Sequence, residues 1–132
     1  MAFITFIGEV VHLIYRRKWY KINAMRIDEF NQLFNEILLP TQLKYGARLV
    51  GRWMTQDNEG AMEVFAIWEY DSHEDYSRIE HQVRSDETHV IRVKKQQEEL
   101  KKLEGSFLLE DPKEDFLSST VARDKTILSA IN

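Results

Sequence analysis

The stretch from Tyr45 to Ser72, YGARLVGRWMTQDNEGAMEVFAIWEYDS, constrains the fold of this chain more than any other segment. Its β-branched and aromatic residues predict a strand at Ala47–Thr55 and a return strand at Ala61–Tyr70. Between them, Gln56–Gly60 has the composition of a hairpin loop. The segment therefore predicts an antiparallel hairpin, and the faces of its two strands decide what else the fold must contain.

The return strand is apolar on both of its faces. One face carries Met62, Val64, Ala66, Trp68 and Tyr70. On the other face, Phe65 and Ile67 lie between Glu63 and Glu69. A strand with one wet face would alternate apolar and polar residues, so we expect both faces of this sheet to be covered. The chain's own helices can cover one face, and a second copy of the sheet can cover the other, which predicts a homodimer.

The amino-terminal part predicts a strand followed by a long helix. Ile14–Ile22 is the strand, with Arg16, Lys18 and Tyr20 on one face, and residues 2–12 extend it or form another strand. An apolar stripe at three- and four-residue steps predicts the helix at Met25–Tyr45. Asn23 is the expected N-cap, Pro40 should kink or split the helix, and Gly46 is the expected C-cap.

The carboxy-terminal part predicts two helices and a last strand. Ser72 caps the first helix, and Asp86 starts a second that runs to about Glu104. The residues of the second helix expected to point inward are Val90, Val93, Leu100 and Leu103, with Gly105 ending it. Ser106–Glu110 is the expected last strand, ended by Pro112.

The resulting order of elements is β-α-β-β-α-β with the second helix broken in two. This is the ferredoxin-like α+β arrangement, an antiparallel sheet with helices on one face. Its other face is too apolar for water, so we expect two sheets packed face to face, as in a dimeric α+β barrel. With 132 residues, the chain is expected to form a single domain (1–132), with a core at about 14–111 and a C-terminal extension at 112–132.

Composition and charge exclude several classes of partner and site. The net charge of −4 argues against a nucleic-acid partner. The absence of cysteine excludes disulfides and thiolate metal sites, and it is compatible with a reducing compartment. The amino-terminal run MAFITFIGEVVHLIY lacks the marks of a signal peptide and is too short to span a bilayer. We therefore predict a cytoplasmic protein without a membrane partner.

Three blocks of the sequence resemble the NIPSNAP family, a branch of the dimeric α+β barrel superfamily. They are Ile14–Ile22, Ile27–Trp53 and Ile67–Ser72 with the helix after it, and together they cover about residues 14–104. In the first block Tyr15 and Tyr20 match the family, and Lys18 stands where an arginine is usual.

The resemblance implies a fold and a homodimer but no established reaction. The main interpretation is a protein without an assigned reaction, and a pocket for a small organic ligand is expected as an additional feature. The alternatives from the wider superfamily are a cofactor-independent monooxygenase acting on an aromatic substrate, with Arg52 or His81 binding or deprotonating it, and a heme-binding protein. The tryptophan that heme-degrading relatives carry after the third strand is replaced here by Tyr76 and Ser77.

The candidate ligand-pocket residues are aromatic or charged side chains of the strands and one helix: Tyr20, Arg48, Arg52, Trp53, Glu63, Trp68, Tyr70 and His81. Charges inside a covered sheet must pair or line a wet cavity, because a lone buried charge is costly. One interpretation is a set of Arg–Glu pairs, such as Arg52 with Glu63, at the dimer interface or rim. The other is a polar-lined pocket that holds an organic acid or an aromatic molecule.

No metal site or cofactor is predicted. The strong nitrogen ligands are His12, His73, His81 and His89, and their spacing matches no ligand set. We expect them on the surface. The five glycines are scattered, so no phosphate-binding loop is expected either.

Overall fold

The computed structural model describes residues 13–102 and 107–121. Its strands are β1 (Ile14–Asn23), β2 (Arg48–Met54), β3 (Ala61–Tyr70) and β4 (Lys113–Leu117). Its helical elements are the 3-10 turn η1 (Ala24–Arg26), α2 (Ile27–Leu33), the π-helix η2 (Phe34–Leu38), α3 (Leu39–Lys44), α4 (His73–Ser85) and α5 (Glu87–Lys101). The predictions for residues 2–12, His12, Leu103 and Gly105 fall outside the described residues.

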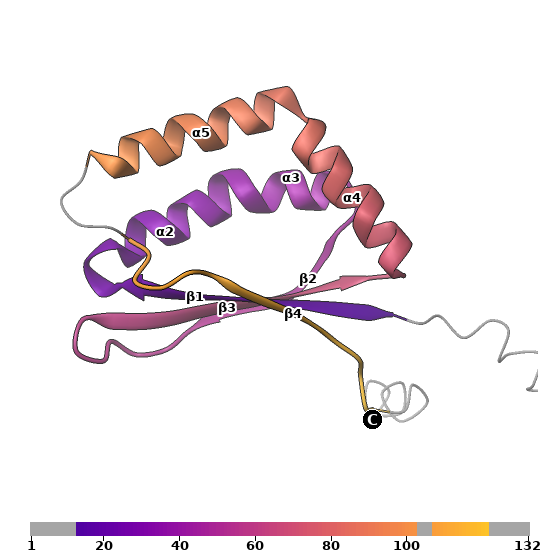
Figure 1. Cartoon of the computed structure of the whole chain (residues 1–132), viewed down its shortest axis with the longest axis horizontal. Helices are drawn as coiled ribbons and strands as arrows, with labels where there is room; N and C mark the ends of the chain where they lie inside the picture. The colour runs from indigo at the N-terminus through magenta and orange to yellow at the C-terminus, as the bar shows by residue number, and fades with distance from the viewer. Residues whose placement is uncertain (1–12, 103–106, 122–132) are drawn as a thin grey trace, which may run out of the picture.

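The four strands form one antiparallel sheet in the order β2-β3-β1-β4. The helices lie on one face of this sheet, and α5 is the farthest from it (Figure 1). This arrangement confirms the prediction of a ferredoxin-like α+β fold. Among the described residues, no helix combines the length and the apolar character that a membrane crossing requires.

The paired strands β1 and β3 form the centre of the sheet. They pair from Ile14 opposite Tyr70 to Asn23 opposite Ala61. The side chains of β3 that face the helices are buried, as predicted: Met62, Val64, Ala66, Trp68 and Tyr70. We call the opposite side of the sheet the outer face; its large apolar residues are Trp19, Trp53, Phe65 and Ile67. The predicted two-sided character of the sheet is therefore confirmed.

A β-bulge at Val50 changes the predicted faces of β2. The register moves from Leu49 opposite Trp68 directly to Gly51 opposite Ile67, so Val50 has no partner on β3. An extra residue of this kind turns every later side chain to the other face of the strand. On the outer face, the Trp53 ring covers Gly51 so closely that it leaves no room for a Cβ at that position.

Regular alternation along this strand predicts that Arg48 and Arg52 share one face, and that prediction is wrong. Arg48 lies opposite Glu69 and belongs to the outer face, whereas Arg52 lies opposite Ala66 on the side of the helices. Alternation by twos cannot reveal a bulge, because an inserted residue leaves no mark in the apolar pattern. The bulge is therefore what turns Arg52 toward the helices.

The predicted helix over Met25–Tyr45 is present, but it changes type along its length. Asn23 caps its first turn, accepting a hydrogen bond from the Met25 backbone amide at 3.0 Å. The chain widens into the π-helix η2 directly before α3, and Pro40 falls in the first turn of α3. Proline brings no amide hydrogen and its ring crowds the turn before it, so the change of helix type beside Pro40 is where the continuous helix accommodates it. Gly46 ends the segment with φ of 108°, as expected for a left-handed C-cap.

Ser72 and Asp86 cap the last two helices, as predicted. Ser72 Oγ accepts from the Asp75 backbone amide, and Asp86 Oδ1 accepts from the His89 backbone amide, both at 3.0 Å. The packing of α5 differs from its apolar pattern, since Leu100 is buried but Val90 is 44% exposed. The apolar pattern does not predict the buried side of α5, because α5 is a separate helix that begins after Asp86. Its packing against neighbouring helices decides which side is covered.

The last strand lies farther along the chain than Ser106–Glu110, so that prediction is wrong. β4 follows Pro112 and pairs antiparallel with β1 at the edge of the sheet. The predicted segment pairs with β1 over only a few residues. In this contact the Leu109 amide donates to the Lys21 carbonyl at 2.9 Å. The strand KEDFL has no apolar alternation to reveal it, because its charged residues pair with arginines of β1.

Candidate functional site

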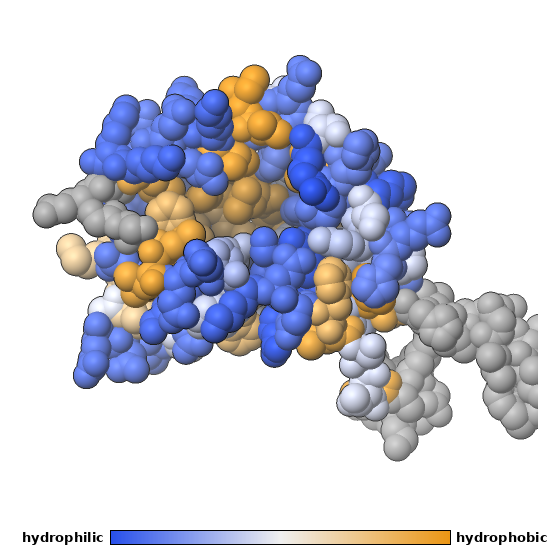
Figure 2. Space-filling model, in the orientation of Figure 1, coloured by the Kyte–Doolittle hydropathy of each residue, from blue (hydrophilic) through white to orange (hydrophobic). Residues whose placement is uncertain are grey.

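The helices and the sheet enclose a cavity of about 310 Å³. Strands β1, β2 and β3 form one side, and α2, η2 and α3 form the other. The apolar side chains of its wall include Phe30, Leu33, Phe34, Leu38, Ala66 and Trp68. Figure 2 shows an apolar hollow between the charged surfaces of α5 and β4, where this cavity opens.

The charged residues that line the cavity are Arg16, Lys18, Arg52 and Glu80. Three of these side chains are cations and one is a carboxylate. Apolar surroundings lower the local dielectric constant, so the charges act more strongly here than in water. The partners of each charge therefore decide what the cavity attracts.

Arg16 is buried and holds the wall of the cavity together. Its Nη1 donates to Glu80 Oε1 and its Nε donates to Glu114 Oε1, both at 3.0 Å. Its guanidinium also lies 5.1 Å from the ring centre of Tyr76. Burial alone would lower the pKa of Arg16, but the hydrogen bond to Glu114 and the charge of Glu80 raise it above its ordinary value. Arg16 is therefore fully engaged in a structural network.

Arg52 has a different environment, although it lines the same cavity. Its Nη1 donates to Asn31 Oδ1 at 2.7 Å, and its guanidinium lies 4.3 Å from the ring centre of Phe34 and 5.3 Å from that of Phe30. Its Nη2 is buried and donates to no group of the described residues. Burial lowers the pKa of Arg52 below its ordinary value. This cation is thus desolvated and only partly compensated.

Gln42 on α3 completes the polar lining. Its Nε2 donates to Glu80 Oε1 at 3.3 Å. Its Oε1 is buried and accepts no hydrogen bond within residues 13–102 and 107–121. Glu80 therefore accepts from both Arg16 and Gln42, and its negative charge is compensated by the wall itself.

Three of the eight predicted site residues, Tyr20, Arg52 and Trp68, line this cavity. They come from three different strands, β1, β2 and β3. The indole of Trp68 packs against the ring of Phe34 from η2, with the ring centres 6.0 Å apart, so the sheet and the helix layer share one aromatic contact beside the cavity. The structure therefore brings these three together between the layers.

Three other predicted residues, Arg48, Trp53 and Glu63, belong to the outer face. Glu63 accepts from Trp19 Nε1 at 2.7 Å, so the predicted pair of Arg52 with Glu63 is wrong. The two side chains lie on opposite sides of the sheet, which is a direct consequence of the bulge.

Arg48 forms the kind of cross-strand pair that the sequence suggested. Its Nε donates to Glu69 Oε1 at 2.7 Å, and its Nη2 donates to Asp71 Oδ1 at 2.8 Å. Both partners belong to the end of the β2-β3 hairpin. The interpretation of Arg–Glu pairing across strands therefore holds for Arg48.

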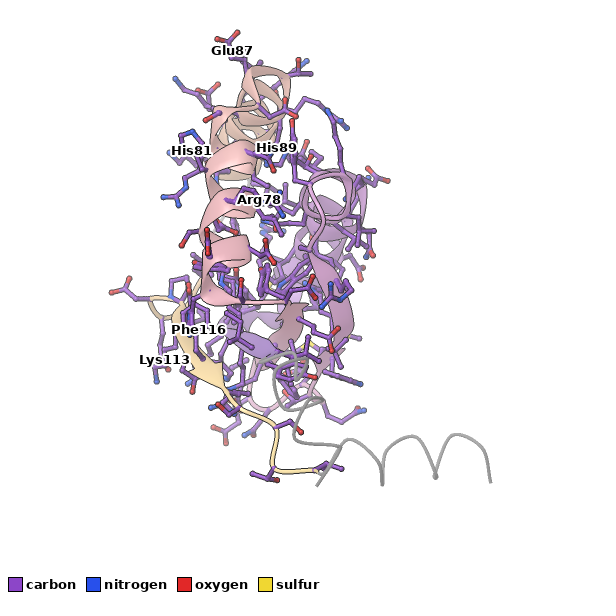
Figure 3. All side chains as sticks on the ribbon, turned by 90° about the vertical axis from the view of Figure 1, so that its right-hand side faces the viewer. Arg78, His81, Glu87, His89, Lys113 and Phe116 are labelled. Atoms are coloured by element: carbon purple, nitrogen blue, oxygen red, sulfur yellow. The ribbon has the colours of Figure 1, made fainter. Side chains whose placement is uncertain are left out.

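Tyr70 and His81 lie outside both surfaces. Tyr70 is buried, with its ring 5.1 Å from that of Tyr76, and it is not part of the cavity wall. His81 is exposed on α4 (Figure 3). The oxygenase alternative stays a prediction, but His81, one of the two residues proposed to act on its substrate, is absent from the cavity wall.

The remaining histidines show no metal-binding arrangement in the part of the chain that the structure describes. No group of three or more histidine, aspartate or glutamate side chains gathers there around a common point. His89 is buried, which contradicts the expectation of a surface histidine, and its Nδ1 lies 2.8 Å from Thr41 Oγ1. Figure 3 shows His89 directed toward the neighbouring helix layer, unlike His81.

The polar residues that the sequence did not single out are Lys18, Gln42 and Glu80. Lys18 shares a face of β1 with Tyr20, so strand alternation contained the signal for it. No comparable sequence pattern indicates that Gln42 and Glu80 line the cavity. Their positions depend on the π-helix before Pro40 and on how α4 packs, and neither follows from local periodicity.

The fold and the cavity together define a ferredoxin-like α+β protein with a small enclosed space between its two layers. The NIPSNAP family model matches residues 15–112 of the chain. The chain therefore belongs to the NIPSNAP family. No curated protein matches it.

Similar solved structures share this fold at low sequence identity. A NIPSNAP family protein of Agrobacterium tumefaciens is 18% identical, with a TM-score of 0.66 over 83% of this chain and 94% of that one. A NIPSNAP-like domain protein of Burkholderia xenovorans is 20% identical, with a TM-score of 0.61 over 86% and 90%. A Bacillus cereus protein, provisionally classed as an antibiotic biosynthesis monooxygenase, is 10% identical, with a TM-score of 0.53 over 85% and 97%. At these identities the likeness shows the fold alone.

Proposed function

We propose that this protein binds a small organic molecule in the cavity between its helices and its sheet. The observation that carries the proposal is an apolar cavity whose wall includes Arg52, a residue with a buried guanidinium nitrogen that lacks a partner among the described residues. Ligand sites are typically apolar hollows with a few fixed polar groups. The volume of about 310 Å³ suits a ligand of one or two rings, since ligand sites range over roughly 300–1,000 Å³.

Binding of a neutral aromatic probe tests this proposal. We expect 2-naphthamide to bind wild-type protein, as measured by saturation-transfer NMR and by a concentration-dependent rise in melting temperature. Ala66 is buried in the cavity wall, so Ala66→Leu should fill part of the space and weaken binding. Ala61→Leu, at the start of the same strand and outside this cavity, is the matched control.

Equal binding of the probe by wild type and Ala66→Leu would place the probe elsewhere and sink the proposal. Its most obvious other location is the outer face, where aromatic side chains are exposed. Loss of binding in the Ala61→Leu control as well would point to a general effect on the sheet and would also count against the cavity.

We also propose that two copies of the chain associate through the outer faces of their sheets. Trp53 is 47% exposed there, and its ring lies 5.5 Å from that of Phe65. Phe65 and Ile67 line a wide hollow of about 790 Å³ on the same face. Exposed apolar patches of this kind are typical of interfaces. A two-fold axis would let the same patch cover itself.

The proposed location of the protein is the cytoplasm. The chain contains no cysteine, so its folding does not depend on disulfide formation. That property is compatible with a reducing compartment, which supports the proposal. Fractionation of the native host, with detection of the protein in the cytoplasmic fraction, is the corresponding measurement.

A further inference from the structure

Arg52 differs from the other arginines of the sheet because no carboxylate of the described residues pairs with it. Arg16, Arg17 and Arg48 each form an ion pair with an acidic side chain at 3.0 Å or less. Within the described residues, Arg52 forms none, and its Nη1 donates to the neutral amide of Asn31. A positive charge on the wall of an enclosed cavity without a counter-charge is unfavourable unless something supplies one.

The other described residues of the wall do not supply that counter-charge. Glu80 is the only acidic side chain among the described residues of the lining, and Arg16 and Gln42 already occupy its Oε1. Lys18 adds a further positive charge to the same lining, with its Nζ 5.5 Å from the ring centre of Tyr20. The potential inside the cavity is therefore positive and favours an anion.

The unsatisfied atom of Arg52 defines what that anion must offer. Its Nη2 is buried and has no hydrogen-bond acceptor among the described residues. A buried donor left unpaired costs free energy, and a charged acceptor relieves more of that cost than a neutral one. The neighbouring rings of Phe30 and Phe34 lie against the same guanidinium, so the acceptor would be attached to an apolar body.

We propose that the cavity selects organic acids, with the ligand carboxylate bound by Arg52 and its ring packed against the apolar side chains of the cavity wall. This inference rests on the proposed ligand-binding function and narrows it to one class of ligand. Phe34 and Trp68 pack against each other with their ring centres 6.0 Å apart, and both line the cavity, so they offer the ligand body one continuous aromatic surface. Arg52 then sets the orientation of the ligand.

A pair of probes that differ only in charge tests the inference. We expect 2-naphthoate to bind wild-type protein about ten- to a hundredfold more tightly than 2-naphthamide, the usual gain from a charge-assisted hydrogen bond. Dissociation constants come from calorimetric titration of the whole chain. Raising the salt concentration should weaken naphthoate binding and leave naphthamide binding unchanged.

Substitution of Arg52 tests whether this residue causes the preference for naphthoate over naphthamide. Arg52→Met should abolish the preference for naphthoate while naphthamide binding persists, and Arg52→Lys should retain part of it because the positive charge remains. The matched control is Arg78→Met, which removes the same charge from the exposed surface of α4 (Figure 3). The salt dependence of wild type keeps the test decisive if Arg52→Met does not fold.

The outcomes separate the two proposals. Equal affinity of wild type for the two probes would overturn the preference for acids and leave the cavity as a general ligand site. Naphthoate preference that survives in Arg52→Met would overturn the role of Arg52. Failure of both probes to bind wild type would instead contradict the proposed function itself.

Discussion

At the scale of single residues, three arginines show that position decides what one type of side chain does. Arg16 is buried and bridges two carboxylates at 3.0 Å each. Arg17, the next residue, is exposed on the outer face and pairs with a carboxylate of β4. Arg52 lines the cavity, and its buried Nη2 has no hydrogen-bond partner in the described part of the chain. Only the first of these should contribute strongly to stability, because it alone combines burial with a complete network.

We expect Arg16→Met to lower the free energy of unfolding by about 3 kcal/mol. The substitution leaves Glu80 and Glu114 without their positive partner, and the penalty is at the lower end for a broken buried pair because Glu114 is 35% exposed. Urea unfolding at one fixed protein concentration measures the change. Adding Glu80→Gln to Arg16→Met should recover part of the loss.

The adjacent Arg17→Met variant is the control for this measurement. Its ion pair with Asp115 is exposed to solvent, so its removal should leave the unfolding curve nearly unchanged. Equal losses in Arg16→Met and Arg17→Met would contradict the view that burial, rather than the presence of an ion pair, determines the contribution.

At the scale of the elements, one carboxylate connects the end of α3 to the start of α5. Asp86 accepts from the His89 backbone amide at 3.0 Å, from the Tyr45 hydroxyl at 2.8 Å and from Lys44 Nζ at 3.4 Å. The His89 amide contributes most, and together these donors lower the pKa of Asp86 to about 2. The N-cap of α5 is therefore also a tether between two helices.

Acid should destabilise the protein through Asp86. Its folded pKa of about 2 lies below the ordinary 3.8, so its contribution is present above pH 3.8 and is lost as the pH falls toward 2. Asp86→Asn keeps an amide oxygen as the cap but removes this titration. We expect the melting temperature of wild type to exceed that of the variant at about pH 5 and the difference to shrink by about pH 2.5.

Asp28→Asn, which changes an exposed carboxylate in the first turn of α2, provides the comparison. If the difference between wild type and Asp86→Asn stays constant across this pH range, the tether is not electrostatic. Thermal melts followed by circular dichroism at several pH values are sufficient for the comparison.

At the scale of the whole molecule, the fold covers only one side of its sheet. The helices occupy one face, and no described helix or strand lies over the outer face, where Trp53 is 47% exposed (Figure 1). Ion pairs such as Arg17 with Asp115 lie beside this apolar surface. An apolar centre with a charged rim is the usual composition of a protein interface.

Phe65→Glu should convert the proposed dimer into a monomer. A carboxylate at this position would be buried without a partner when two outer faces meet. Light scattering after size-exclusion chromatography measures the mass. Ile91→Glu places the same charge on the exposed side of α5, where Ile91 is 65% exposed, and should leave the mass unchanged. A wild-type protein of monomeric mass, or a Phe65→Glu variant of dimeric mass, would argue against the interface.

Local signals in the sequence identified most of the elements and the two-sided sheet. β3 has the predicted bounds, and Asn23, Ser72 and Asp86 cap the helices as expected, because strand alternation and capping depend on neighbours in the chain. The exposed apolar residues of the outer face were also visible in advance. These features are local, so a single sequence contains the information for them.

The location and chemistry of the cavity were decided by the tertiary structure. The bulge at Val50 turns Arg52 toward the helices, η2 sets the position of Gln42, and the charged strand β4 supplies Glu114 to Arg16. None of these produces a periodic pattern, because each depends on contacts between residues far apart in the chain. The sequence by itself thus determined the NIPSNAP fold and its bare outer face, and packing between the layers decided which charges remain available to a ligand.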